Sequence, residues 1–386
     1  MRKMMRVGMA MLAVALAATA CGSSKSTSAS STTAAGSAAA GTGVKCSGIK
    51  IGYLGALSGE NGQLGQNMVD GANIAIDEWN AANKDCQITL VKSDSQGDPK
   101  QATPLADTIV QDKSIVALLG PGFSGETKAT MPKFEEAGLP IISPSATNAQ
   151  LQNNGWKSFH RILANDDKQA PAVSALIKSK GAKKVGVVDD ASEYGKGLAD
   201  GVRKDLGALK VADDQIDPKA SDYSAAVNKM KAAGVDYVFY GGYYAEAAKL
   251  VKQLRGAGVT ATFVSGDGAL DQKFVDNAGK DGEGALLTAT GAPPNVNPEF
   301  QKKFNDRYKK DPTLYAPESY DIVKIYSDAL SAGKQDRKSI LEFLGTYDKP
   351  GVTKQIKFDS KGEVAGDSVY SYVVQGGKIG GQGIIK

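Results

Sequence analysis

The sequence predicts an α/β protein of two similar lobes, each a mostly parallel sheet flanked by helices, joined by a hinge of crossing segments. Short β-branched runs alternate with amphipathic stretches along most of the chain, a pattern typical of parallel sheets covered on both faces. The 386 residues are 41% apolar and 23% charged. This is enough apolar material for two globular units, because single cores stop growing near about 250–300 residues.

The first unit is expected to begin at Ile49 and the second to follow a polar loop and the connecting strand FHRILA. The first unit has the predicted strands IKIGYL, QITLVKSD, IVALLG and LPIIS and helices over 65–80, 99–112 and 124–137. The second has helices over 168–180, 194–206, 224–233 and 244–257 and strands VGVVDD, YVFYG, TFVSGD and ALLTATG. The segments LGQNMVDGA from Leu64 and YGKGLADGV from Tyr194 share Gly, Asp and Gly, which indicates related units.

Helices over 298–308, 319–332 and 337–344 and the hairpin-like SVYSYVVQGGKI complete these two units. We expect residues 46–163 with 291–357 to form the N-terminal lobe and 164–290 with 358–386 to form the C-terminal lobe. Ligands of open α/β sheets collect outside the carboxyl ends of the strands. Two such edges facing each other would enclose a cleft.

The N-terminus predicts export. Met1 to Arg6 carries three positive charges, and residues 7–20 are uncharged and mostly apolar, which is typical of a secretory signal over residues 1–20. Fourteen residues reach about 21 Å, short of the ~30 Å hydrocarbon core. Cys21, after Ala18-Thr19-Ala20, resembles the acylated Cys of a bacterial lipoprotein. The alternative is an ordinary cleaved signal with an incidental Cys.

Residues 21–45 form a predicted tether, because the 24 positions from Gly22 to Lys45 hold 21 Ser, Thr, Ala or Gly residues. The protein has 46 basic and 42 acidic residues, and five basic residues lie in the signal and tether. The remaining body has 41 basic against 42 acidic residues, a balance that does not suit nucleic-acid binding.

Cys46 and Cys86 each precede a predicted strand, and one helix separates those strands. In a right-handed βαβ unit such strands are parallel and often adjacent, so their starting ends lie side by side. Export supplies the oxidising compartment that a disulfide needs. We therefore expect a Cys46–Cys86 disulfide, with two reduced buried thiols as the alternative.

Catalytic motifs are scarce. His160 is the only His, which excludes multi-His metal sites and leaves one imidazole for any nucleophile. Its place in a connecting strand favours a structural role. GPGFSG from Gly120 has dinucleotide-binding spacing but lacks the acidic residue that would hold a ribose. We predict no enzyme activity, no metal and no cofactor.

Polar and aromatic residues at strand-to-helix corners predict a small-molecule site instead. Ser124 caps the helix after GPGFSG in our prediction and, with exposed backbone N–H groups, offers an anion site; a cap without a ligand is the alternative. Tyr243 and Tyr244 follow a strand and would face the cleft. Asp267 in SGDG is either a turn residue or the partner of a ligand ammonium.

Together these segments resemble the leucine/isoleucine/valine-binding protein family, solute-binding components of ABC transporters with the type I periplasmic-binding-protein fold. The likeness covers residues 47–386. Its most specific stretches are ALSGENGQLG, LLGPGFSGET, IISPSATN, DDASEYGKG, DYVFYGGYYAE and VSGDG.

The resemblance implies a set of ligand-binding positions. Ser124 and Thr147 would bind a ligand α-carboxylate, and the carbonyl of Ser145 and the side chain of Asp267 would bind the α-ammonium. The remaining positions implied for the site are Ala146, Tyr194, Tyr243 and Leu64. Asp267 stands where relatives commonly have an acid, and Leu64 stands where well-known amino-acid binders carry an aromatic residue.

The expected function is capture of a branched-chain or similar apolar amino acid outside the cell and delivery to an ABC permease and its ATPase. The protein would be a monomer, held at the cell membrane by a lipid on Cys21. Alternatives are the same fold binding an amide, urea, an aromatic acid or another small metabolite, an extracytoplasmic sensor, or an enzyme on this scaffold.

Overall fold

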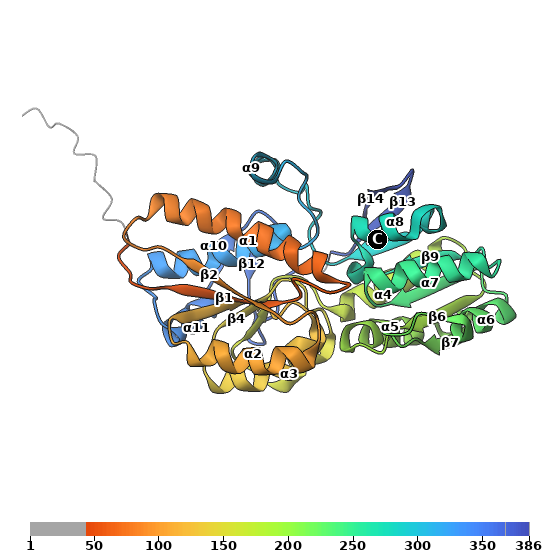
Figure 1. Cartoon of the computed structure of the whole chain (residues 1–386), viewed down its shortest axis with the longest axis horizontal. Helices are drawn as coiled ribbons and strands as arrows, with labels where there is room; N and C mark the ends of the chain where they lie inside the picture. The colour runs from red at the N-terminus through yellow and green to blue at the C-terminus, as the bar shows by residue number, and fades with distance from the viewer. Residues whose placement is uncertain (1–43, 367, 386) are drawn as a thin grey trace, which may run out of the picture. The chain divides into compact units, whose positions relative to one another are not determined.

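The computed structural model describes residues 44–366 and 368–385 as two main sheets flanked by helices, with a small third sheet (Figure 1). The predicted signal of residues 1–20, the lipidation position Cys21 and almost all of the tether lie outside the described residues. Within the described part of the chain, no helix has both the length and the apolar character needed to cross a membrane.

The first main sheet has five parallel strands in the order β2-β1-β3-β4-β5. The strands are β1 (Lys50–Gly55), β2 (Thr89–Asp94), β3 (Ile115–Leu119), β4 (Ile141–Ser143) and β5 (Phe159–Arg161). The helices of this lobe are α1 (Gly62–Ala82), α2 (Pro99–Gln111), α3 (Ser124–Glu136), α9 (Pro298–Tyr308), α10 (Ala316–Ser331) and α11 (Arg337–Leu344). Helix α1 packs against α10 on one face of the sheet and α2 packs against α3 on the other (Figure 1).

The second main sheet has the order β14-β13-β10-β9-β8-β6-β7. Its parallel strands are β6 (Val185–Asp189), β7 (Lys210–Gln215), β8 (Tyr237–Gly241), β9 (Thr262–Ser265) and β10 (Leu286–Ala289). The hairpin of β13 (Tyr370–Gln375) and β14 (Lys378–Ile384) adds two antiparallel strands. The helices are α4 (Asp166–Ser179), α5 (Glu193–Leu206), α6 (Ser224–Ala233), α7 (Tyr244–Gly256) and α8 (Gln272–Ala278).

The sequence patterns did not predict β7, α8 or the small sheet of β11 (Asp348–Pro350) and β12 (Gln355–Lys357). Strand β7, KVADDQ, is an edge strand with mostly polar residues, so it lacks the apolar run of a central strand. Helix α8 has only seven residues, and Phe274, Val275 and Ala278 anchor it. A helix this short is defined mainly by tertiary packing.

Helix α1 begins at Gly62, three residues before the predicted start. Gly65, the first residue predicted for this helix, lies against the carbonyl oxygen of Ala56 and the hydroxyl of Tyr53, where a Cβ would collide with both. Glycine is therefore required for the helix to approach the end of β1 this closely.

The chain passes between the two main sheets at three places: after β5, after β10 and between β12 and β13. The second passage is tied to the first lobe by α10, because the Glu318 carboxylate accepts a hydrogen bond from the backbone N–H of Ala292 at 2.7 Å. Short crossing segments of this kind are where hinge rotation takes place in two-lobed proteins.

Cys46 and Cys86 form a disulfide, with their Cα atoms 4.6 Å apart. The bond joins the approaches to β1 and β2, which run parallel with Lys50 opposite Thr89. The adjacency of these two strand starts is the geometry that the sequence pattern predicts.

Replacing both cysteines (C46S/C86S) is expected to lower the free energy of unfolding by about 4 kcal/mol in the chain-entropy treatment, because the bond closes a separation of 40 residues. Urea unfolding of the oxidised proteins measures the difference. As a control, dithiothreitol should bring the wild-type protein to the stability of the variant and leave the variant unchanged. Equal midpoints for the two oxidised proteins would contradict this expectation.

Candidate functional site

Segments that follow the carboxyl ends of the parallel strands in the two sheets meet each other, and we call the region between them the cleft. Hydrogen bonds cross it: Asn148 Nδ2 donates to the Glu193 carbonyl at 2.5 Å, and Asn67 Nδ2 donates to Asp271 Oδ2 at 3.0 Å. The Lys128 ammonium also lies 3.0 Å from the Glu193 carboxylate. These contacts join α1, α3 and the loop after β4 to the second lobe.

Ser124 is buried at the entrance to α3, where its Oγ accepts a hydrogen bond from the Asn148 backbone N–H at 3.2 Å. The prediction that Ser124 caps this helix is wrong, because Phe123 occupies the N-cap position and Ser124 is the first helical residue. Glu126 supplies the cap by accepting from the Phe123 backbone N–H at 2.8 Å. The Ser124 hydroxyl proton therefore remains available for a ligand in the cleft.

The loop after β4 carries Ser145, Ala146 and Thr147, all of which are buried. Ser145 Oγ donates to the carbonyl of Gly122, which ties this loop to the turn before α3. The Thr147 hydroxyl lies beside the Asp166 carboxylate, and its hydrogen bond partly offsets the rise that burial causes in the pKa of that carboxyl.

Asp267 lies fully buried at the end of β9, where two tyrosine hydroxyls donate to it. Tyr194 OH lies 2.6 Å from Asp267 Oδ1, and Tyr315 OH lies 3.0 Å from Asp267 Oδ2. Burial raises the pKa of the Asp267 carboxyl. The structure thus brings Tyr194 and Asp267 together and adds Tyr315, which comes from the segment before α10.

Asp166 is a second buried acid that the sequence analysis missed. It is the first residue of α4, its backbone N–H donates to the Thr147 carbonyl at 2.9 Å, and its carboxylate lies beside the Thr147 hydroxyl. Burial, followed by the nearby charge of Asp267, raises the pKa of Asp166. In sequence, Asn165-Asp166-Asp167 resembles an ordinary helix start, which gives no sign that Asp166 is buried while Asp167 is exposed.

An aromatic wall closes the cleft. The rings of Phe123 and Tyr243 stack with centroids 4.5 Å apart, and Tyr243 also lies 5.2 Å from the ring of Tyr194. Leu64 is fully buried in the same hydrophobic cluster as Phe123. Phe123 was missed because it adjoins the polar Ser124, and a helix-cap position carries no signal for an aromatic contact across a cleft.

His160 lies apart from this cleft. Its ring packs edge-on against Phe358 with centroids 5.0 Å apart, and burial lowers its pKa to about 4. No cluster of three or more His, Cys, Asp or Glu side chains suited to a metal ion occurs in the described part of the chain.

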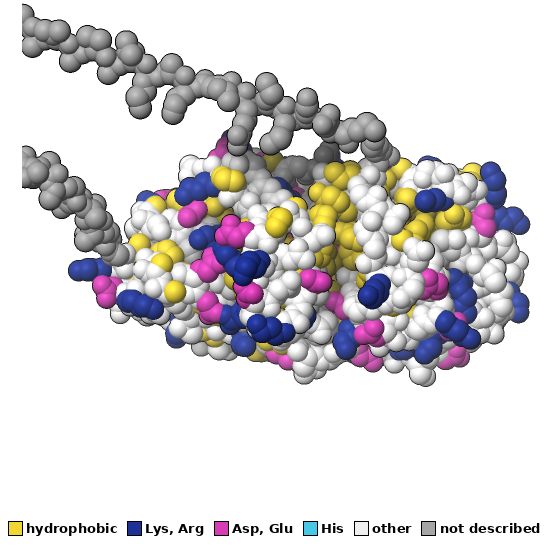
Figure 2. Space-filling model, turned by 90° about the horizontal axis from the view of Figure 1, so that it is seen from above, with side chains coloured by type: hydrophobic (Ala, Val, Ile, Leu, Met, Phe, Trp, Pro, Cys, Tyr) yellow, Lys and Arg dark blue, Asp and Glu magenta, His cyan; other side chains and the backbone are white. Residues whose placement is uncertain are grey.

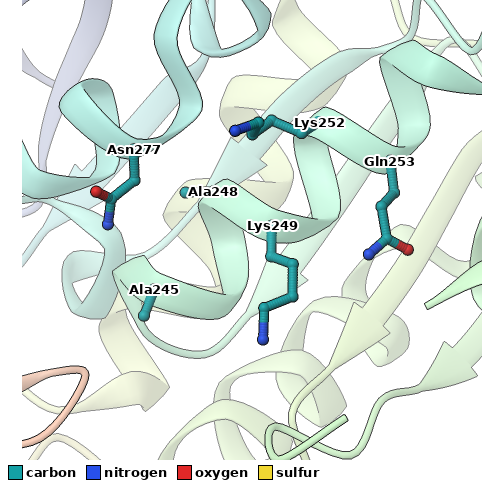
Figure 3. A pocket seen from close by; sticks show the side chains of 6 residues that line it. All are labelled: Ala245, Ala248, Lys249, Lys252, Gln253 and Asn277. Atoms are coloured by element: carbon teal, nitrogen blue, oxygen red, sulfur yellow. The ribbon is translucent and has the colours of Figure 1, made fainter. Parts of the chain in front are cut away.

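Besides a pocket of about 360 Å³ between the start of α1 and Tyr244, two surface pockets in the described part of the chain lie outside the cleft. One of about 430 Å³ is lined by residues of α7 and by Asn277 of α8 (Figure 3). A larger groove of about 830 Å³ lies between α8, the segment before α9 and the β13–β14 hairpin. Figure 2 shows hydrophobic side chains gathered between more charged flanks on the face seen from above. Neither pocket contains any of the site residues predicted from the sequence.

The chain is similar to known amino-acid-binding proteins over most of its length. It is 32% identical to an "Amino acid binding protein" of Pseudomonas aeruginosa, covering 84% of this chain and 88% of the relative. It is 30% identical to a leucine-, isoleucine-, valine-, threonine- and alanine-binding protein of the same organism, with 82% and 87% covered.

A solved structure agrees with these sequence relatives. It is the branched-chain amino acid transporter substrate-binding protein of Streptococcus pneumoniae in complex with isoleucine, at TM-score 0.80 and 31% identity, covering 86% of this chain and 97% of that one. The family described as "Periplasmic binding protein" matches residues 48–378. This chain therefore belongs to the periplasmic binding protein family, with the two-lobed type I fold, and is a solute-binding protein rather than an enzyme.

Proposed function

We propose that this protein captures a branched-chain or similar apolar amino acid in the cleft, outside the cell membrane, and delivers it to the permease of an ABC importer. The observation that carries the proposal is the gathering of buried hydroxyl and carboxylate groups where segments of the two lobes meet. Hydroxyl donors at the start of α3 and in the loop after β4 suit an anion, and two buried carboxylates suit a cation.

The carboxylate of the amino acid would lie at Ser124 and Thr147. Ser124 stands at the first position of α3, where free backbone N–H groups and the helix dipole favour a negative charge. The Thr147 hydroxyl, which lies beside the Asp166 carboxylate, would rotate to donate a second hydrogen bond. Charge-assisted hydrogen bonds of this kind are roughly twice as strong as neutral ones.

The ammonium would lie between Asp166 and Asp267, with the carbonyl of Ser145 as a further acceptor. Asp267 already accepts from two tyrosines, whereas Asp166 has only the Thr147 hydroxyl beside it. Asp166 therefore has the greater unused acceptor capacity, and we assign it the principal charge contact. The mutual repulsion of two buried acids would be relieved by a bound cation.

The apolar side chain would contact Leu64 and the rings of Phe123 and Tyr243. These groups offer hydrophobic area without an additional charge, which favours an aliphatic side chain over a charged one. The relatives that bind leucine, isoleucine and valine support this class of ligand.

Delivery would depend on closure. We propose lobes of residues 46–163 with 291–357 and 164–290 with 358–386, which rotate about the crossing segments. A ligand that contacts Ser124 in one lobe and Asp267 in the other binds the closed state better than the open one and so shifts the population toward it. The permease would recognise the closed state, and a lipid on Cys21 would hold the protein at the membrane.

Calorimetric titration should detect binding of leucine, isoleucine or valine. Analogues of leucine that lack one charge test the proposed carboxylate and ammonium sites separately. Removal of either the amino group, as in 4-methylpentanoate, or the carboxylate, as in 3-methylbutylamine, should weaken binding by about 100-fold or more, since charged hydrogen bonds are lost from a buried site. No heat with any of the twenty amino acids would refute the proposal. Tight binding of 4-methylpentanoate or an aromatic acid would favour a carboxylic-acid ligand instead.

Substitution S124A should weaken binding of the amino acid by about tenfold, because one hydrogen bond to a charged group is lost. The matched control is S224A. Ser224 is also the first residue of a helix, α6, but it is exposed and belongs to the second lobe. Affinity for leucine measured by calorimetry should be unchanged in S224A; an equal loss in both variants would show that Ser124 has no specific role.

Substitution D166N should stabilise the ligand-free protein at pH 7 by about 2 kcal/mol and weaken ligand binding. Burial raises the pKa of Asp166, so the native state binds the proton more tightly than the unfolded chain. The stability of wild type should therefore fall as pH rises above the unfolded value near 3.8.

Thermal unfolding between pH 3 and 8 measures this effect. The advantage of D166N should vanish at the acidic end, where wild-type Asp166 is protonated in both states. The neighbouring variant D167N is the control, because Asp167 is exposed and should change stability by less than about 0.5 kcal/mol. A D166N protein less stable than wild type at pH 7 would contradict the expectation.

A further inference from the structure

A buried ion pair lies where the binding loop meets the crossing segments. Arg161, at the end of β5, is fully buried, and its Nη2 lies 2.7 Å from Glu363 Oε1. Its Nε also donates to both carboxylate oxygens of Glu363, at 2.8 and 2.9 Å. Glu363 belongs to the segment between β12 and β13.

The other side of the Arg161 guanidinium holds the loop after β4. Nη1 donates to the carbonyl of Ala146 and to the carbonyl of Asn148, each at 2.9 Å. These two carbonyls stand on either side of Thr147. Because the guanidinium is planar and rigid, its position holds both carbonyls and so restrains the backbone on either side of Thr147.

Glu363 is bonded in turn to two of the three crossing segments. Its Oε2 accepts from Asn165 Nδ2 at 3.0 Å, and Asn165 is the N-cap of α4. Its own segment is bonded to β5, since the Arg161 backbone N–H donates to the Gly362 carbonyl at 3.0 Å. The carboxylate therefore joins the passage after β5 to the passage before β13.

The loop continues this chain of contacts into the second lobe. Asn148 accepts from Arg161 through its carbonyl, donates from its backbone N–H to Ser124 Oγ, and donates from its side chain to the Glu193 carbonyl. A change in the angle of the crossing segments thus reaches Ser124 and Thr147 through contiguous hydrogen bonds.

We infer that Arg161 and Glu363 are positioning residues that couple the angle of the crossing segments to the geometry of the ligand-binding loop. The identity of the ligand in this inference rests on the proposed function. The coupling between the crossing segments and the loop does not. Rotation of the crossing segments during opening displaces the carboxylate from the guanidinium, and the loop loses its support. The Arg161–Glu363 pair therefore holds the loop after β4 in its binding conformation only when the lobes are closed. Burial of an ion pair is by itself a weak source of stability, which agrees with a positioning role.

The test uses E363Q and R161K in the whole exported protein. Gln keeps an acceptor for Asn165 but removes the negative charge. Lys keeps a positive charge but lacks the planar fork that reaches two carbonyls. The matched control is E135Q, the same change at the opposite end of β5, where the Glu135 carboxylate accepts from the Lys157 and Ser158 backbone N–H groups at 3.0 and 2.8 Å.

Two readouts separate positioning from stability. In the ligand-free protein, hydrogen exchange at the amides of Ala146 and Asn148 should rise about fivefold or more in E363Q and R161K, while the amides of β1 and β6 stay unchanged. With leucine as the probe, calorimetric affinity should fall about fivefold or more at a temperature where all variants are folded. E135Q should shift the melting temperature but leave both the loop exchange and the affinity within twofold of wild type.

Unchanged hydrogen exchange at the Ala146 and Asn148 amides in E363Q would overturn the inference, whatever the affinity for leucine. An affinity loss in E135Q equal to that in E363Q would also overturn it, because general destabilisation would then explain both. Should wild type bind no amino acid, the proposed function fails, and the exchange measurement still decides the coupling.

Discussion

The central constraint on this protein is the cost of holding two carboxylates in a closed cleft away from water. Asp166 and Asp267 are both buried, and burial raises the pKa of each. Two tyrosine hydroxyls offset part of that cost at Asp267, and the Thr147 hydroxyl offsets less of it at Asp166. Buried titratable groups with perturbed pKa values cluster at functional sites.

The fold places these groups together because the carboxyl ends of two parallel sheets face each other. Each strand ends in a short corner before its helix, and such corners present backbone N–H groups and side chains to the same space. Ser124 and Thr147 come from the first sheet, and Tyr194, Tyr243 and Asp267 come from the second. The groups proposed for the ligand carboxylate and those proposed for its ammonium thus belong mainly to different lobes. A dipolar ligand would therefore hold the lobes together.

Arg161 and Glu363 connect this arrangement to the crossing segments. The guanidinium contacts the loop that carries Thr147, and the carboxylate contacts the segments that join the lobes. Binding and closure would then share one set of hydrogen bonds rather than being linked by the ligand alone. Coupling through a contiguous network is physically reasonable because packed interiors shift between discrete arrangements.

The sequence by itself determined the alternation of strands and helices and the family resemblance, because hydrophobic periodicity and strand-to-helix corners are local patterns. The adjacency of Cys46 and Cys86 also followed from local order, since neighbouring parallel strands start side by side. The tertiary structure alone decided that Asp166 is buried while Asp167 is exposed, that Phe123 stacks on Tyr243, and that Glu363 meets Arg161 from about 200 residues away. Burial and long-range pairing depend on how separate elements pack, and no local pattern records that information.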